Sequence, residues 1–229
     1  MRGRNTKRRL ADLSIIYTGT VQISLGRFMV ETDLKRVVWL RLAGLCGVAS
    51  PVAALSSTFL AISYSPWFSW MGNALSDLGV SSAAAIFNFG MILAGLLLTI
   101  FAVGCIKRVG KGSLRFAGAF LLVLGAVSFM AVGVFPESTG WVHVSVSAAF
   151  FTLELIGFLL IGAAFIQKSS EKGSGLFSIS AAVWVIGVWM FWFWAFPQRG
   201  VAIPELLSLL AFQSWSIVFG VRLLKKSIL

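Results

Sequence analysis

Six long apolar stretches, separated by polar segments, dominate the pattern along the chain. A helix that crosses a bilayer needs about 20 apolar residues. The stretches cover roughly residues 37–63, 83–106, 114–134, 141–167, 176–196 and 204–224. Because most connections are short, consecutive helices are expected to run antiparallel. The pattern therefore predicts an all-α integral membrane bundle of six transmembrane helices, formed by residues 35–229.

The composition indicates a membrane protein rather than a soluble one. Hydrophobic residues make up 58% of the chain and charged residues 12%, with a mean hydropathy of +0.92, whereas soluble domains carry about 25% charged residues. A net charge of +11 would suggest nucleic acid in a soluble protein, but beside transmembrane helices positive charge sets orientation. We expect membrane lipids and no nucleic acid as partners. The sequence leaves open whether the chain forms a homo-oligomer.

The basic residues predict the orientation of the bundle. If the N-terminus is cytoplasmic, eighteen of the 19 lysines and arginines lie on the cytoplasmic side and Arg199 alone lies outside. This asymmetry follows the positive-inside rule, so both termini are predicted to be cytoplasmic, in a multi-pass protein of the cell membrane. Residues 1–34 are polar and basic, and we expect a disordered tail there. Met29 is an alternative start for the chain.

The longest outer segment, Tyr64 to Ser82, is too apolar for a freely solvated loop. We expect a re-entrant or interfacial segment that lies over the outer mouth of the bundle. Its polar residues Asn73, Ser76 and Asp77 have two interpretations. Such side chains commonly cap helices and bond to nearby backbone groups; alternatively, Asp77 supplies a carboxylate to an outward-facing site.

Other polar residues collect at the same level of the bundle. Glu137, Ser138 and His143 follow the third stretch, and Glu205 opens the last one. His143 is the only histidine and is a candidate general acid or base if Asp77 or Glu137 orients it. The alternative is an interfacial histidine bonded to a backbone group. A triad of Ser76 or Ser138 with His143 and Asp77 lacks the usual Gly-x-Ser-x-Gly nucleophile turn.

No metal or cofactor is expected from these residues. One histidine with carboxylates would be an unusual zinc ligand set. Cys46 and Cys105 lie inside apolar stretches, where cysteine behaves as a small hydrophobic residue.

Glu154 lies near the middle of the fourth stretch, at bilayer depth. An ionisable group there is costly and is a functional candidate by default. Helical spacing places His143, Ser147 and Glu154 on one face, which Asn88 in the second helix and Gln213 in the sixth could face. The alternative is that a protonated Glu154 hydrogen-bonds a neighbouring helix and contributes only to packing.

Two sequence blocks carry a family resemblance. The first is Asn73-Ala74-Leu75-Ser76-Asp77-Leu78-Gly79 with Ile86-Phe87-Asn88-Phe89-Gly90, and the second is Gly133-Val134-Phe135-Pro136-Glu137 with His143. They resemble an archaeal and bacterial membrane family, the domain of unknown function nine-nine-eight, over about residues 36–225. A fainter likeness exists to the DRAM and Sfk-type six-helix proteins. The resemblance implies six helices, no established activity, and motif positions Asn73, Ser76, Asp77, Asn88, Glu137 and His143.

Three hypotheses for function remain. The first is binding or modification of a lipid-like or amphipathic substrate at an outer site, with Asp77, Glu137 and His143 as catalytic candidates. Its substrate-binding candidates are Asn73, Ser76, Asn88, Glu154 and Glu205. The second is a small transporter or channel that uses Glu154, and the third is a non-catalytic membrane scaffold.

Overall fold

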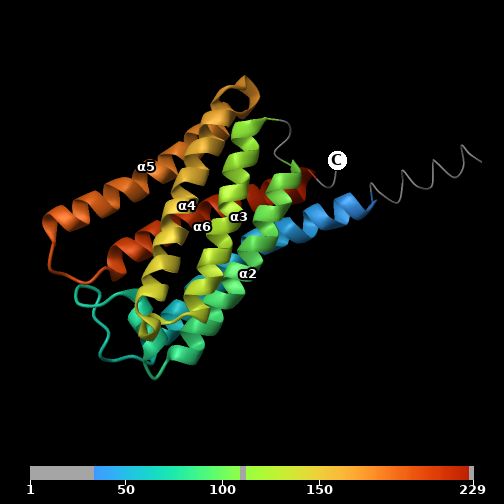
Figure 1. Cartoon of the computed structure of the whole chain (residues 1–229). Helices are drawn as coiled ribbons and strands as arrows, with labels where there is room; N and C mark the ends of the chain where they lie inside the picture. The colour runs from blue at the N-terminus through green and yellow to red at the C-terminus, as the bar shows by residue number, and fades with distance from the viewer. Residues whose placement is uncertain (1–33, 109–111, 227–229) are drawn as a thin grey trace, which may run out of the picture. The chain divides into compact units, whose positions relative to one another are not determined.

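The computed structural model describes residues 34–108 and 112–226 (Figure 1). Every long element in these residues is an α-helix. An N-terminal helix spans Leu34–Ser63. It is followed by α2 (Ala84–Arg108), α3 (Ser113–Val134), α4 (Trp141–Ile166), α5 (Lys172–Ala195) and α6 (Ala202–Lys226). All six are long and apolar enough to cross a membrane, so the predicted fold class is confirmed. The predictions for the tail before Leu34, including Met29, lie outside the described residues.

Three short 3-10 helices lie in the connections between the long helices. They are η1 (Leu75–Val80), η2 (Glu137–Thr139) and η3 (Ser169–Glu171). Pro136 and Pro197 each follow the end of a long helix, because proline cannot continue the hydrogen-bond ladder. The segment between the N-terminal helix and α2 contains η1, so part of this connection is helical.

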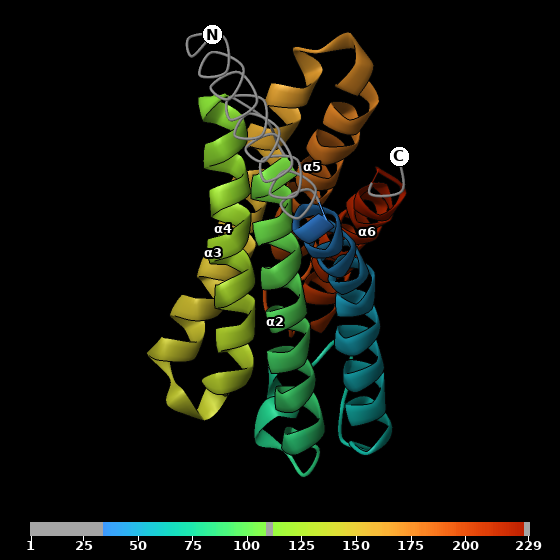
Figure 2. The same cartoon turned by 90° about the vertical axis from the view of Figure 1, so that its right-hand side faces the viewer.

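Small residues allow the helices to approach each other closely. α3 packs along both α2 and α4, and α5 lies beside α4 and α6 (Figure 2). Ala94, Ala119, Ala126 and Ala182 have no exposed surface. Close backbone approach through small residues is the usual basis of helix association in a membrane, where lipid and protein interiors are equally apolar.

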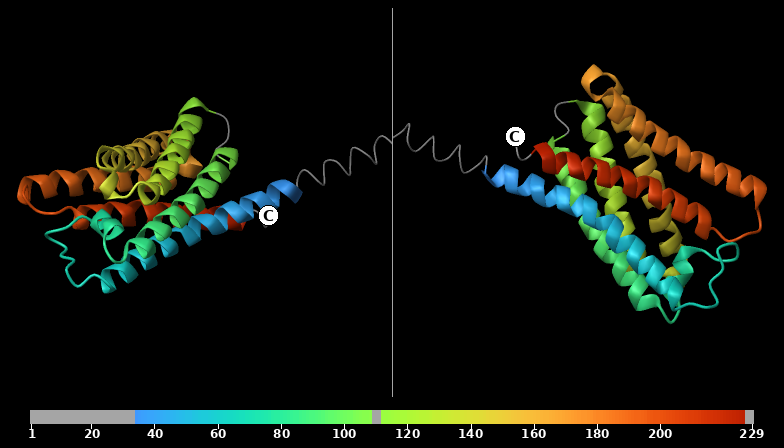
Figure 3. Two further views of the ribbon diagram at one scale, coloured as in Figure 1. Left: turned by 60° about the horizontal axis from the view of Figure 1, so that its bottom comes forward. Right: turned by 180° about the vertical axis from the view of Figure 1, so that it is seen from behind.

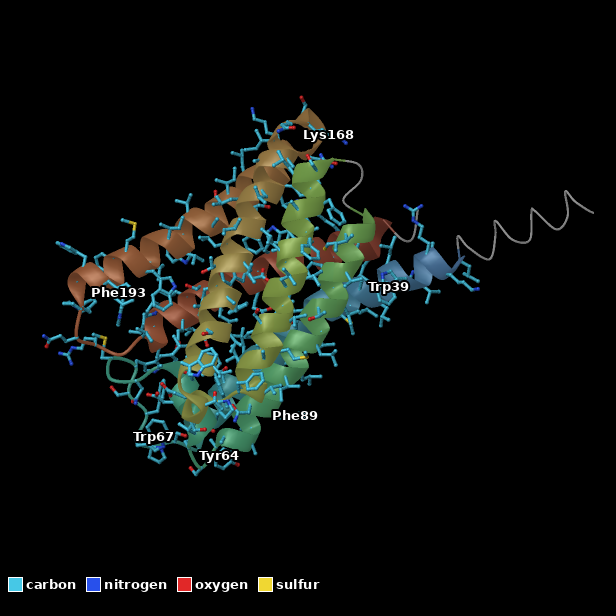
Figure 4. All side chains as sticks on the ribbon, viewed as in Figure 1. Trp39, Tyr64, Trp67, Phe89, Lys168 and Phe193 are labelled. Atoms are coloured by element: carbon cyan, nitrogen blue, oxygen red, sulfur yellow. The ribbon has the colours of Figure 1, made fainter. Side chains whose placement is uncertain are left out.

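Aromatic side chains fill the centre of the bundle and also cover its outside. Phe101 and Phe158 are almost completely buried, and Phe158 stacks on Trp215 with ring centroids 4.8 Å apart. By contrast, Phe89 and Phe193 point away from the bundle (Figure 4) and are 67% and 56% exposed. An apolar exterior of this kind suits a lipid environment.

The connections lie at two opposite ends of the helices, which we name by their chemistry (Figure 3). The carboxylate end contains η1, η2 and the α5–α6 connection, and Tyr64 and Trp67 lie there (Figure 4). The arginine end contains η3 and the start of α3, with Lys168 beside them. The orientation of the two ends across a membrane stays a prediction.

Candidate functional site

Local hydrogen bonds shape the segment before η1. The Asn73 side chain accepts a bond from the Ser69 amide at 2.9 Å and donates one to the Asp77 carboxylate at 2.7 Å. The same Asp77 oxygen accepts the Ala74 amide at 3.1 Å. Asn73 and Asp77 therefore have the local, capping role that was one of their two interpretations. This role fixes where the Asp77 carboxylate lies.

The α5–α6 connection is paired with the same segment. The Gly200 amide donates to Met71 O and the Ala202 amide to Asn73 O, both at 2.9 Å. The Trp192 indole donates to Gly200 O at 3.0 Å. A Cβ atom on Gly200 would lie 2.3 Å from the backbone of Asn73, so only glycine fits at this contact. The pairing brings η1 and the start of α6 together.

Two side chains hold η1 at opposite ends. The Glu205 carboxylate, in the first turn of α6, accepts the Leu75 amide at 2.6 Å. The Asn88 carboxamide, on α2, donates to Gly79 O at 2.8 Å. Both bonds satisfy backbone groups that a short helix leaves without internal partners. Asn88 is thus part of the η1 support rather than of a face opposite Glu154.

Three carboxyl groups lie at this end of the bundle, and we call them the carboxyl trio: Asp77 in η1, Glu137 in η2 and Glu205 in the first turn of α6. Glu137 begins η2, which packs against η1. A hydrogen bond with the Asp77 carboxyl, burial and the Asp77 charge together raise the pKa of Glu137 to about 7. Glu205 interacts electrostatically with both other members. A nearby like charge favours the protonated form of a carboxyl group, so Glu137 keeps its proton to a higher pH than an ordinary glutamate.

A cavity of about 50 Å³ lies beside Glu205 and is bounded by η1 and five long helices: the N-terminal helix, α2, α3, α4 and α6. Its polar lining comes from Thr58, Ser76, Ser147 and Glu205. The rest of its wall is apolar, and half of these residues are aromatic: Leu75, Phe87, Met91, Phe129, Val132, Phe150, Phe151 and Leu209. The Glu205 carboxyl therefore lies at one side of a cavity whose other walls are largely apolar.

His143 is buried, and its two ring nitrogens have other partners. Nδ1 lies 2.8 Å from Phe135 O, and Nε2 lies 3.4 Å from the Ser147 hydroxyl. A carbonyl only accepts, which assigns the ring proton to Nδ1. Within the described residues, neither Asp77 nor Glu137 bonds to His143. The structure therefore links His143 to Ser147 on the cavity wall, and Ser138 is exposed to solvent.

Glu154 lies deeper in the bundle and apart from the trio. It is 4% exposed, and its Oε1 has no hydrogen-bond partner among the described residues. Gly125 on α3 makes the space for it, because a Cβ there would lie 2.8 Å from that oxygen. Helical spacing correctly placed His143 and Ser147 together. Phe150 lies between them and Glu154 along α4 and contributes to the cavity wall.

Sequence reasoning missed the contribution of Gly200 and of Thr58. Gly200 acts through its backbone, which no side-chain pattern reveals. Thr58 belongs to the N-terminal helix, and the sequence did not show which side of that helix faces the bundle.

Within residues 34–108 and 112–226, no group of three histidine, cysteine, aspartate or glutamate residues is placed to hold a metal ion.

Comparison with known proteins supports the family resemblance. The sequence profile of a family described as "Protein of unknown function (DUF998)" matches residues 48–222. The chain belongs to the DUF998 family. The match covers five of the six helices completely or nearly so, together with η1, η2 and the carboxyl trio. Comparisons with curated proteins and with solved structures gave no match.

Proposed function

We propose that this DUF998 protein binds an amphipathic molecule with a cationic head group at the carboxylate end of the bundle. The observation that carries the proposal is the carboxyl trio beside an apolar cavity. Small-molecule sites are typically apolar chambers with a few converging polar groups. In this arrangement the trio receives the head group and the cavity receives the start of the apolar tail.

The charge of the trio favours a cation over an anion. Glu137 and Glu205 both interact electrostatically with Asp77, and carboxylates that interact in this way repel each other unless a proton or another positive charge lies near them. A bound ammonium group would replace the proton on Glu137. Binding should therefore release protons and weaken as the pH falls below about 7, the pKa of Glu137.

The cavity sets a limit on what enters it. A water molecule needs at least about 10 to 15 Å³ of such space, so about 50 Å³ accommodates a few carbon atoms. A longer tail would extend from the cavity along the apolar surface of the bundle. Binding, rather than catalysis, is the function we infer, because His143 bonds to Phe135 and Ser147 instead of orienting against a carboxylate.

The test uses three dodecyl probes that differ only in head group: dodecylamine, dodecanol and dodecanoate. Calorimetric titration into the purified protein in detergent should show binding of the amine only. Glu137→Gln should weaken it about tenfold or more, as expected for loss of a charged hydrogen bond. Glu171→Gln removes a carboxylate at the arginine end and is the matched control. Equal binding of dodecanol would contradict the proposal.

Glu154 favours a second candidate, an ion- or proton-coupled transporter. Its carboxyl oxygen is buried without a partner in the described residues, and intramembrane carboxylates often belong to proton relays. In reconstituted vesicles, proton flux through the wild-type protein that is lost in Glu154→Gln would support this function. No flux in either protein would exclude it.

A further inference from the structure

We propose a second binding site at the arginine end of the bundle, a pocket for a phosphate group that is carried by a membrane lipid. The pocket has a volume of about 130 Å³ and is bounded by α2, α3, α4, α5, α6 and η3. It is separate from the carboxyl trio, because the two cavities share no lining residue. The proposal does not depend on the function inferred for the carboxylate end.

Two arginines from different helices form the polar side of this pocket. Arg115 belongs to α3 and is only 7% exposed, whereas Arg222 belongs to α6 and is exposed. The guanidinium of Arg115 lies 5.1 Å from the Phe165 ring, and that of Arg222 lies 4.9 Å from the Phe219 ring. Phe165 and Phe219 are themselves stacked, 5.8 Å apart. The stacked rings therefore hold both guanidinium groups beside one pocket.

The charge around the pocket is positive. Glu171, the only acidic residue of its lining, bonds to Arg115 at 2.5 Å. Arg222 donates to the Ser174 hydroxyl, and this hydroxyl retains a proton that it can donate to a ligand. Two cations, one anion and a hydroxyl donor leave a net positive charge at the pocket. Guanidinium groups bind phosphate through paired hydrogen bonds.

The remaining wall of the pocket suits an apolar chain. It consists of Cys105, Ile161, Phe165, Trp215, Phe219 and Leu223. Trp215 stacks on Phe219 at 4.2 Å and on Phe158 at 4.8 Å, so the aromatic surface continues toward the bundle centre. A free phosphate ion would leave this apolar wall uncovered. The combination favours a phosphate group attached to a lipid tail, and basic pockets between transmembrane helices commonly bind such head groups.

The role of Glu171 distinguishes a binding site from a structural ion pair. If Arg115 serves only to tie α3 to η3, Glu171 has no effect on a ligand. If Arg115 contacts the phosphate group, Glu171 competes with that group for the same guanidinium. Removing the Glu171 charge should then tighten phosphate binding, although it breaks the ion pair.

The test is native mass spectrometry of the full-length protein in detergent, with three probes. Phosphatidic acid carries an anionic phosphate monoester, phosphatidylcholine with the same acyl chains carries a phosphodiester whose charge is cancelled by its choline, and inorganic phosphate lacks the tail. We expect phosphatidic acid to bind and phosphatidylcholine to be displaced by it. If inorganic phosphate at millimolar concentration also binds and displaces the lipid, the site takes a free phosphate group; if it does not, the source is the lipid.

Arg222→Gln carries the main test, because this residue is exposed and its loss should not disturb folding. It should weaken phosphatidic acid binding about tenfold or more. Lys225→Gln removes the same charge from the same helix outside the pocket lining, and binding should stay within about twofold of wild type. Glu171→Gln should bind severalfold more tightly. The proposal is overturned if Arg222→Gln matches Lys225→Gln, if Glu171→Gln binds more weakly, or if phosphatidylcholine binds as well as phosphatidic acid.

Discussion

The contact between Asp77 and Glu137 shows how a local structural role can create a chemical one. Asp77 accepts the Asn73 side chain and the Ala74 amide, which fixes its position in η1. Glu137 reaches it from η2, where the end of α3 places it. Neither residue is unusual alone, but the Asp77 carboxyl helps to raise the pKa of Glu137 to about 7. The chemistry of this site therefore depends on two turns that are about sixty residues apart.

Glu137 should make the stability of the protein depend on pH. Its pKa rises from 4.5 to about 7 on folding, so the folded state binds a proton more tightly than the unfolded state. By linkage, the free energy of unfolding falls as the pH rises between these two values. Glu137→Gln should remove this dependence and stabilise the protein at pH 8 by roughly 1 kcal/mol or less, since solvent screens the group.

The measurement is thermal unfolding in detergent at pH 5 and pH 8. Ser138→Ala, at an exposed neighbour in η2, is the control and should retain the wild-type pH dependence. The raised pKa of Glu137 would be contradicted if, relative to Glu137→Gln, the wild-type protein were more stable at pH 8 than at pH 5.

Gly125 should be intolerant of a side chain because of Glu154. An alanine Cβ there would lie 2.8 Å from the Glu154 carboxyl, and overpacking of this kind costs about 1 to 3 kcal/mol. Gly125→Ala should lower the unfolding temperature, and Glu154→Ala in the same chain should recover part of the loss. Gly187→Ala adds a Cβ with no neighbour within 4 Å and should be tolerated. Additive effects of the two substitutions would show that the contact is absent.

At the scale of elements, the carboxylate end is built by backbone pairing between two connections. The segment before η1 and the chain between α5 and α6 are more than a hundred residues apart, yet the Gly200 and Ala202 amides donate two main-chain bonds to carbonyls of that segment. Glu205 then bonds to the first residue of η1. These bonds tie the segment to α6, because they satisfy its Met71 and Asn73 carbonyls and its Leu75 amide in place.

Gly200→Ala should separate the segment before η1 from α6. The new Cβ would collide with the Asn73 backbone at 2.3 Å, and backbone atoms cannot move aside as a flexible side chain can. We expect a loss of about 1 to 3 kcal/mol in stability together with weaker dodecylamine binding. Gly173→Ala, which meets nothing within 4 Å, is the control. Limited proteolysis between residues 64 and 83 should increase in Gly200→Ala only.

At the scale of the whole molecule, charge and chemistry are divided between the two ends. The carboxyl trio lies at one end, and Arg115, Arg222, Lys168 and Lys172 lie at the other. The positive-inside rule then predicts that the arginine end faces the cytoplasm. This orientation would expose the trio to extracytoplasmic solutes and the arginine pocket to lipids of the inner leaflet.

Cysteine labelling in whole cells checks the orientation. Cys46 and Cys105 are buried, so the background should be low. Ser138→Cys, in η2 at the carboxylate end, should react with a membrane-impermeant maleimide in intact cells. Ser169→Cys, in η3 at the arginine end, should react only after permeabilisation. The reverse pattern would show that the bundle has the opposite orientation.

The sequence by itself determined the six helices, since twenty or so apolar residues in a row leave the backbone no other way to satisfy its hydrogen bonds in lipid. It also identified Asp77, Glu137 and Glu205 as residues at one level of the bundle, because antiparallel helices bring alternate connections to the same end. It did not show that these three carboxyls interact, that His143 bonds to Phe135 and Ser147, or that Arg115 and Arg222 share a pocket. Only the tertiary structure decided these points, because they depend on how each helix is rotated and on backbone bonds such as that between Gly200 and Met71. Nearly uniform apolar helices carry little polar pattern to specify that rotation.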